Sequence, residues 1–346
     1  MAEGKPAPLG AIDFDRVRDD YVRDGFVVVD NIFSPAEVDA LNAEAAAIVR
    51  GERGAIVGGD AGLGRSETQL MSEVIAIHFP HKISPLVRAT MAHPNVVPVL
   101  RALISPNVKA MQTMLFVKHA GQPGQAWHQD EHYIPTRDRS LTGAWIALDD
   151  ATIENGCMWM HPGSHKAGIL WAVRPHDDAR FDSADEAIAH PYALEGGTPV
   201  ELRAGGVAFF NGYVLHRSLP NRARRGFRRA LVTHYMSAES LLPWTLGATR
   251  ARPDVRDIVM ICGEDPYAWR GLEELTSPTC GRTTPSAPRR STPNWRNGAA
   301  RRTRPRDEEK TAASATLTRI IDQFDAVSIL CTLSQSVRPD SIAGRR

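Results

Sequence analysis

The sequence has little of several features that would mark common classes of protein. Lysine and arginine (41 residues) nearly balance aspartate and glutamate (40), so the net charge is +1, and no general attraction to nucleic acid or to an acidic membrane surface is expected. No apolar run approaches the roughly 18 residues of a membrane span, and the first residues lack the apolar stretch of a secretory signal peptide. The sequence therefore predicts a cytoplasmic protein with neither a nucleic-acid partner nor a membrane partner.

Cysteine is also scarce. The four cysteines are widely spaced and include no Cys-x-x-Cys pair, which predicts free thiols in a reducing compartment rather than a disulfide framework. The glycine-rich stretch at residues 58–62 is not followed by Lys-Ser or Lys-Thr, so a phosphate-binding loop is not expected.

Residues 1–107 carry mostly helical signals. Ser34-Pro35-Ala36-Glu37 is a favourable helix start, with serine as the N-cap, proline at the first helical position and glutamate at the third. Just before it, the Phe-Val-Val-Val run at residues 26–29 predicts a short buried strand. Residues 84–103 predict further helices that cover a sheet. We expect residues 1–107 to form a helical region that packs on the core.

The centre of the chain, residues 108–270, predicts β structure. Short apolar segments are separated by turn residues at the roughly 8–12-residue spacing of a sandwich or barrel, and Asn155-Gly156 is a strong signal for a tight turn. Residues 172–195 are acidic and contain proline and histidine, so they predict an insertion or lid rather than sheet. The fold class is therefore mainly β with flanking helices (α+β), and residues 108–270 are expected to form one domain with the N-terminal region.

The segment from Trp127 to Tyr133 contains the first candidate for chemistry, His128-x-Asp130. On a strand, side chains two residues apart point to the same face. His128 and Asp130 can therefore hold one metal ion from a rigid backbone, with Gln129 turned away. His176-x-Asp178 has the same spacing, but its polar neighbours predict a solvated loop.

His216, about ninety residues further on at the end of an apolar segment, is the candidate third ligand. Two histidines and one carboxylate form the facial triad of non-haem Fe(II) oxygenases, and the antiparallel strands of a double-stranded β-helix can bring such distant residues together. Arg228 follows on a strand with small or apolar neighbours. A buried arginine needs an anionic partner, and its planar guanidinium suits a carboxylate.

These motifs occur together with others in a fixed order: Trp127 to Pro135, Trp145, Asn155-Gly156-Cys157, Pro162-Gly163-Ser164-His165-Lys166, His216-x-Ser218-x-x-Asn221 and Gly226-Phe227-Arg228. In this order they resemble the phytanoyl-CoA dioxygenase family. Members are Fe(II)- and 2-oxoglutarate-dependent oxygenases, so the resemblance implies a double-stranded β-helix (jelly-roll or cupin-like) core packed by the N-terminal helices. It also implies the iron ligands His128, Asp130 and His216, with Arg228 binding the distal carboxylate of 2-oxoglutarate.

The resemblance further implies residues of the 2-oxoglutarate pocket. Met114, Lys118 and Trp145 fall where the family lines that pocket, and Gln112, on the same face as Met114 and Lys118, would lie nearer the substrate. Each has a simpler alternative, because Met114 and Trp145 are also typical core residues and Lys118 could be a surface lysine.

The remaining histidines are interpreted as structural or supporting, because a facial triad needs only two. His234 faces the same way as Arg228, so it is a candidate for hydrogen-bonding support of the site. The others in this group are His132, His161 and His165.

The implied cofactors are Fe(II), 2-oxoglutarate as co-substrate, and O₂. The expected reaction hydroxylates an unactivated C–H bond of a small-molecule metabolite, coupled to conversion of 2-oxoglutarate to succinate and CO₂. Halogenating relatives lack a carboxylate at the position of Asp130, so its presence favours hydroxylation. Two alternatives stay open: a non-catalytic metal- or ligand-binding jelly-roll protein, and an oxygenase acting on an acyl-CoA. The oligomeric state is not predicted.

Residues 271–346 differ in composition from the rest of the chain. Arginine, proline, serine and threonine dominate residues 282–306, which predicts a largely disordered basic tail, with a possible short helix at residues 316–333. The alternatives are a basic arm for nucleic acid or acidic lipid and a frameshifted reading of a GC-rich gene.

Overall fold

The computed structural model describes residues 12–59, 65–182, 185–188, 190–193, 195–240, 258–271 and 277–282. The predicted helix at residues 316–333 and the arginine-rich stretch beyond Arg282 lie outside these residues. The helices are α1 Phe14–Asp24, α2 Pro35–Val49, α3 Glu67–Glu73, α4 Pro85–Thr90 and α5 Val97–Leu103, with short 3-10 helices η1 Pro80–Lys82, η2 Asp130–His132, η3 Ser164–Ala167 and η4 Ala268–Arg270. The strands are β1 Phe26–Val29, β2 Val74–His78, β3 Val108–His119, β4 Gln125–His128, β5 Thr142–Ala147, β6 Met158–Met160, β7 Val173–Arg174, β8 Glu186–Ala187, β9 Thr198–Val200, β10 Val207–Asn211, β11 His216–Ser218, β12 Phe227–Ser237, β13 Val259–Cys262 and β14 Thr279–Arg282.

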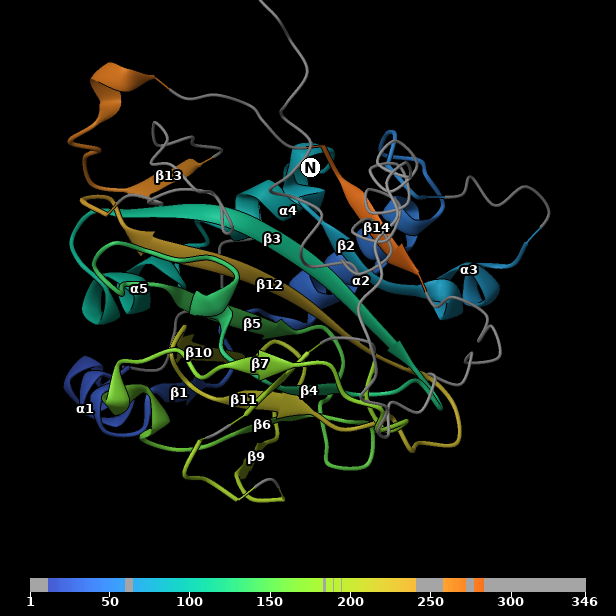
Figure 1. Ribbon diagram of the computed structural model, residues 1–346. Coiled ribbons are helices and arrows are strands. Elements are labelled where there is room, and N and C mark those ends of the chain that lie inside the picture. Colours follow the sequence, from blue (N-terminus) through green and yellow to red (C-terminus); the bar gives the residue numbers. More distant parts are fainter. Residues whose placement is uncertain are drawn as a thin grey trace, which may run out of the picture.

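Eight strands form a large antiparallel sheet in the order β1-β10-β5-β12-β3-β2-β14, with β13 also paired to β3. β3 and β12 are its long neighbouring strands (Figure 1), and their register sets Lys118 opposite Arg228 and Gln112 opposite His234. Because side chains alternate along a strand, these four polar residues share one face of the sheet, which we call the inner face.

A second, four-stranded sheet in the order β4-β11-β6-β9 packs on this inner face. The core between the two sheets contains buried Met114, Trp145 and Val232 from the large sheet and Met158 and Met160 from the small one. The two antiparallel sheets sandwich this core as in a double-stranded β-helix, so the predicted fold class, mainly β with flanking helices around a jelly-roll core, is confirmed.

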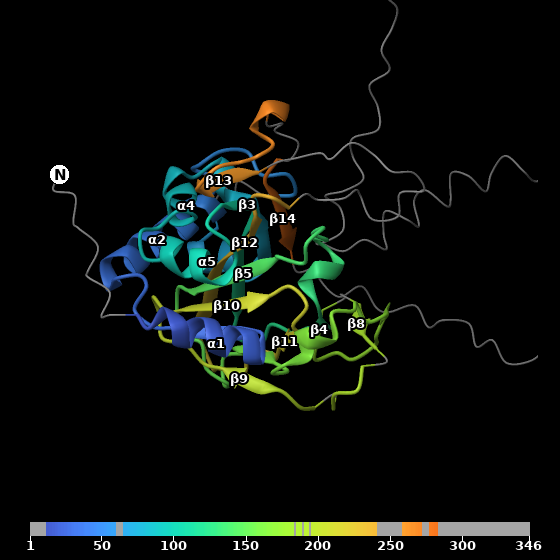
Figure 2. The same ribbon diagram turned by 90° about the vertical axis from the view of Figure 1, so that its left-hand side faces the viewer.

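Helices cover the outer face of the large sheet, where Leu115 and Leu231 pack with helical residues such as Leu41 and Val99. Figure 2 shows α2, α4 and α5 on one side of β3, β5 and β12, with β4, β9 and β11 on the other. The predicted start of α2 is confirmed, because the Ser34 hydroxyl accepts from the Glu37 backbone N–H and the Glu37 carboxylate accepts from the Ser34 N–H in a capping box.

Two strands of the large sheet were not predicted. β2 lies in the region expected to be helical, and β14 lies within the range expected to be a disordered tail; the two strands pair with each other. The run Val74-Ile75-Ala76-Ile77 is apolar at every position, so its sequence does not distinguish a buried strand from a buried helix. In the structure β2 also pairs with β3, on the side away from β14, and this pairing makes the run a strand.

The predicted insertion, residues 172–195, lies outside both main sheets, since its strands β7 and β8 pair with one another. The described residues of 169–197, here called the cover segment, lie over the outer face of the small sheet. There Trp171, Tyr192 and Ala187 pack against Trp127 and Leu215. None of the helices in the described part of the chain is long and apolar enough to cross a lipid bilayer.

Candidate metal centre

The small sheet brings His128, Asp130 and His216 together. His128 ends β4, His216 begins β11, and their Cα atoms are register partners. One oxygen of Asp130, Oδ1, lies 3.6 Å from His128 Nε2 and 3.5 Å from His216 Nε2, and the potential ligand atoms of all three lie within 4.8 Å of one another. Across the described residues, this is the single group of three or more such side chains able to hold one metal ion.

The expectation that His128 and Asp130 share a strand is wrong in detail, because β4 ends at His128 and Asp130 begins η2. Gln129 between them keeps an extended backbone (φ −127°, ψ 128°), which explains why the two side chains still point to one side. The Gln129 side chain points elsewhere: its amide nitrogen donates to the carbonyls of Ile169 and Tyr213, and its oxygen accepts from the Trp171 N–H.

Backbone hydrogen bonds fix the tautomers of the two histidines. His128 Nδ1 lies 2.8 Å from the Ala126 carbonyl, and His216 Nδ1 lies 3.0 Å from the Val214 carbonyl. A carbonyl only accepts, so each Nδ1 carries the proton and each Nε2 offers its lone pair on the side of Asp130. Burial, aided by the His216 ring, lowers the pKa of His128 to about 3, which keeps this imidazole in the form that binds metals.

Asp130 is ionised and oriented by a third histidine. His234 Nε2 lies 3.0 Å from the other carboxylate oxygen, Oδ2. Burial opposes ionisation, but the nearby His216, His234 and His128 hold the pKa of the Asp130 carboxyl below its usual range. The structure thus places His234 where the sequence suggested a supporting role.

A cationic end of the pocket lies further along the inner face. Arg228 is 3% exposed; its Nη2 donates to the Gly156 carbonyl at 3.0 Å, its guanidinium carbon lies 5.2 Å from the centre of the Trp145 ring, and its Nε has no hydrogen-bond partner. The Lys118 ammonium donates to the Ser218 hydroxyl (2.7 Å) and to the Leu219 carbonyl (2.8 Å).

Both cations are desolvated. Burial lowers the pKa of Arg228 to about 10 and that of Lys118 well below its ordinary value, the latter with a contribution from Arg228. Lys118 is therefore not the surface lysine of the alternative interpretation. β11 connects this end of the pocket with the metal centre, since His216 and Ser218 both belong to it.

The remaining predicted pocket residues divide between core and site. Met114 and Trp145 are buried in the core between the sheets, and the Trp145 ring also lies against Arg228. Gln112 lies not beside Arg228 but opposite His234, and its amide nitrogen is 3.2 Å from His78 Nδ1. His78, on the unpredicted β2, carried no local sequence signal.

The other candidate histidines stay apart from the triad. His161 stacks on the outward-facing Trp127 ring at 4.3 Å, and His165 Nε2 lies 3.2 Å from the Val22 carbonyl. In the His176-x-Asp178 segment, Asp178 pairs with Arg180 at 2.7 Å, but His176 is half-buried with its ring against Phe181. The segment is therefore a loop, as predicted, but one that is only partly solvated.

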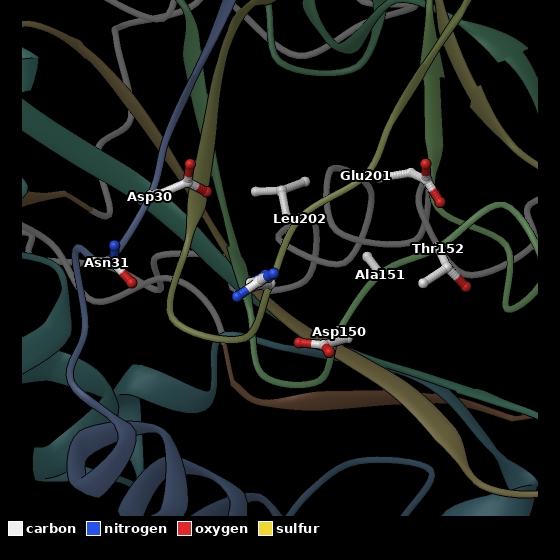
Figure 3. A pocket seen from close by; sticks show the side chains of 8 residues that line it. Asp30, Asn31, Asp150, Ala151, Thr152, Glu201 and Leu202 are labelled. Carbon is white, nitrogen blue, oxygen red and sulfur yellow. The ribbon is translucent and has the colours of Figure 1, made fainter.

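A separate recess lies at the ends of β1, β5 and β9, lined by Asp30, Asn31, Asp150, Ala151, Thr152, Glu201, Leu202 and Arg203 (Figure 3). It contains no histidine. Two of its carboxylates already accept backbone hydrogen bonds, Asp150 from Ala204 and Glu201 from Ile153. These carboxylates therefore serve to fasten the adjoining turns, and the recess is distinct from the His-Asp-His site.

The residues present suit an iron ion and a dicarboxylate. Two neutral imidazoles and one carboxylate form a typical facial donor set for Fe(II). Among the described residues, no carboxylate forms an ion pair with the buried Arg228, whose Nε–H is an unused donor, and a buried charge is costly without such a partner.

Comparison with known proteins finds one matching family and several similar chains. The family model for phytanoyl-CoA dioxygenase (PhyH) matches residues 21–230. Phytanoyl-CoA dioxygenase 1 of rice (Oryza sativa subsp. japonica) is 32% identical over 167 residues, which cover 47% of this chain and 57% of that protein. The peroxisomal phytanoyl-CoA dioxygenase of Homo sapiens is 27% identical over 231 residues, or 63% of this chain and 67% of that protein. The match thus spans little more than half the length of the rice relative.

A solved structure shares the fold. The epimerase SnoN in complex with Fe3+, alpha ketoglutarate and nogalamycin RO has a TM-score of 0.52 and 23% sequence identity. The similarity covers 70% of this chain and 93% of that one.

Proposed function

The chain belongs to the phytanoyl-CoA dioxygenase family, and from that membership we propose that it is an Fe(II)- and 2-oxoglutarate-dependent dioxygenase that hydroxylates an unactivated C–H bond of a small molecule. The observation that carries the proposal is the gathering of His128, Asp130 and His216 from two paired strands and the helix between them. The activity, the substrate class and the cofactors of this chain are all part of the proposal.

Each residue of the site has a defined part in this proposal. The Nε2 atoms of His128 and His216 and the carboxylate of Asp130 would hold Fe(II), and Arg228 would bind the distal carboxylate of 2-oxoglutarate through its unused Nε–H and a terminal N–H. With O₂, these cofactors supply oxidising power as 2-oxoglutarate becomes succinate and CO₂. Burial of Arg228 and Lys118 strengthens their attraction for an anion, because the local dielectric is low.

Asp130 favours hydroxylation over halogenation, since its carboxylate fills the coordination position that a halide would need. His234 holds that carboxylate through Oδ2, which leaves Oδ1 on the side of the two imidazoles. The whole ligand set therefore has a fixed orientation before any metal binds.

A small-molecule substrate is favoured over an acyl-CoA by the placement of the basic residues. Arg222, Arg224 and Arg225 are exposed on the turn before β12, and Arg229 pairs with Asp149 at 2.7 Å. The exposure of the three arginines and the ion pair of Arg229 support a solvated turn rather than a site formed for the phosphates of CoA. Relatives named as phytanoyl-CoA dioxygenases make the acyl-CoA the alternative to test. A cytoplasmic location stays a prediction.

The proposal is tested by anaerobic titration of the protein with Fe(II) and 2-oxoglutarate. Formation of a metal-to-ligand absorption band with one equivalent of each is expected, followed by Fe(II)-dependent succinate release in air. Asp130→Ala should abolish hydroxylation, whereas Asp178→Ala, which removes the carboxylate of the other His-x-Asp segment, should leave it unchanged. Hydroxylation that persists in Asp130→Ala or in excess chelator would contradict the proposal and favour a non-catalytic protein. Succinate release stimulated by phytanoyl-CoA alone would favour the acyl-CoA alternative.

A further inference from the structure

A second polar group lies on the inner face, beside the metal centre. His78 of β2, Gln112 of β3 and His234 of β12 come from three neighbouring strands and are 1%, 8% and 4% exposed. Gln112 is the register partner of His234 and contacts His78, and His234 contacts Asp130. We call His78, Gln112 and His234 the inner polar cluster.

Hydrogen bonds define which nitrogens of the cluster carry protons. The ionised carboxylate of Asp130 only accepts, so His234 Nε2 donates to it and His234 Nδ1 is left as an acceptor. The amide nitrogen of Gln112 only donates, so His78 Nδ1 accepts and His78 Nε2 carries the proton. Both remaining nitrogens, His234 Nδ1 and His78 Nε2, are buried without a partner. The two histidine rings of the cluster therefore have one unused acceptor and one unused donor.

Buried polar atoms nearly always find a partner, so two unused ring nitrogens in one cluster indicate a group that is bound during function. The distal carboxylate of the co-substrate does not account for them. Arg228 lies six residues from His234 along β12, and its unused donor is the one suited to the distal carboxylate. The inner polar cluster lies away from Arg228, next to Asp130.

We propose that the inner polar cluster binds the primary substrate, and that the substrate presents a neutral hydroxyl group to it. A hydroxyl group donates and accepts at once, so it can donate to His234 Nδ1 while accepting from His78 Nε2. The assignment rests on the proposed function, because it reserves the Arg228 end for 2-oxoglutarate.

The electrostatics of the cluster agree with a neutral group. Burial, with a smaller contribution from the His234 ring, lowers the pKa of His78 to about 4, so this imidazole is uncharged near neutral pH. Gln112 is uncharged as well. A phosphate or carboxylate would find no positive charge on His78 or Gln112, and an ammonium would find one unused acceptor but would leave the His78 donor unpaired.

The experiment compares three probes of one shape. Cyclohexanol donates and accepts, cyclohexanone only accepts, and cyclohexylammonium only donates and carries a charge. Each is titrated under anaerobic conditions into the full-length protein loaded with Fe(II) and 2-oxoglutarate. Paramagnetic broadening of the ring protons by Fe(II) measures binding beside the metal. The wild-type protein is expected to bind cyclohexanol about tenfold more tightly than the other two, since a missing partner leaves a buried polar group unpaired.

Three variants test which residues cause the preference for cyclohexanol. His78→Phe removes the unused donor, and Gln112→Leu removes the partner that fixes the His78 tautomer; both should bring the three affinities to within about twofold. His81→Phe is the matched control, because His81 is 4% exposed but its ring contacts Thr113, at 2.7 Å, on the opposite face of the sheet. It should keep the preference. The absorption band of the Fe(II)-bound co-substrate checks that each variant is folded.

Wild-type protein that shows the absorption band could still bind the three probes equally or not at all. Either result would overturn the substrate assignment but not the proposed function. A preference that survives both His78→Phe and Gln112→Leu, or that is lost in His81→Phe, would overturn it too. Wild-type protein without the absorption band would instead contradict the proposed function, and the substrate assignment with it.

Discussion

At the scale of single residues, the candidate iron ligands are oriented by their own backbone. His128 and His216 each place Nδ1 against the carbonyl of the residue two positions earlier, Ala126 and Val214. Because these partners are local, the ring orientation follows from the strand conformation alone. Asp130 is different, since the group that orients it, His234, lies 104 positions away in the chain.

Arg228→Lys is expected to weaken binding of 2-oxoglutarate. A lysine ammonium cannot offer two parallel N–H groups to a carboxylate, so the KM for 2-oxoglutarate should rise by about 10- to 100-fold, with little change in Fe(II) affinity. Steady-state succinate release at varied 2-oxoglutarate measures this. The neighbouring Arg229→Lys is the control, because Arg229 pairs with Asp149 away from the site. Equal KM values in the two variants would remove Arg228 from the proposed role.

The sequence predicts some residues of the site and cannot predict others. The His128-x-Asp130 spacing, the distal His216 and the inward Arg228 are visible as local patterns, and the structure brings the first three together. Their binding of iron and co-substrate stays a proposal. His78 follows an apolar run and has no signal of its own, because its meaning depends on the pairing of β2 with β3. The placement of Gln112 away from Arg228 likewise depends on strand register.

At the scale of elements, α2 is tied to its neighbours by one buried carboxylate. Glu44 accepts from the guanidinium of Arg53 at 2.8 Å and from the Ser84 hydroxyl, at the N-cap of α4, at 2.7 Å. Hydrogen bonds from Arg53, opposed by burial, lower the pKa of the Glu44 carboxyl below its ordinary value of 4.5. The ionised form therefore stabilises the contact between these helices.

Glu44→Gln is expected to lower the free energy of unfolding by about 1 kcal/mol at pH 7, a modest value because Arg53 is partly exposed and solvent screens the pair. A lowered carboxyl pKa contributes stability above the ordinary pKa, and that contribution is lost as pH falls through the folded-state pKa. The difference between wild type and variant should shrink below pH 4.5. Urea unfolding at several pH values measures it, and a difference that grows in acid would exclude this role.

At the scale of the whole molecule, the fold is a sandwich with a different cover on each side. Helices cover the large sheet and the cover segment lies over the small one, so the inner face between the sheets is shielded from water. The mainly β fold class follows from the sequence, because turn spacing and strand composition indicate a sandwich or barrel. The inclusion of β2 and β14 in the large sheet does not follow from the sequence, since a short apolar run can form either a helix or a strand.

Fe(II) and 2-oxoglutarate together are expected to raise the melting temperature. Ligands that bind only the folded state stabilise it by about 2.7 kcal/mol at a hundred times Kd, which for a domain of this size is a shift on the order of 5 °C. Anaerobic thermal unfolding with and without chelator measures the shift. Asp130→Ala should lose it and Asp178→Ala should keep it. An equal shift in both variants would mean that the metal binds elsewhere.

The side chain of Gln129, between two candidate ligands, also bears on how this fold can change over time. Its amide holds the start of the cover segment at residues 169–171, and the Gly124 backbone holds residues 180–182 through reciprocal hydrogen bonds with Arg180 and Asp182. Between these two anchors, β7 is also held by its pairing with β8, which leaves residues 175–179 as a loop fixed at both ends. Insertions there should be tolerated without moving the metal centre, so the length of this loop can diverge between related chains while the site keeps its geometry.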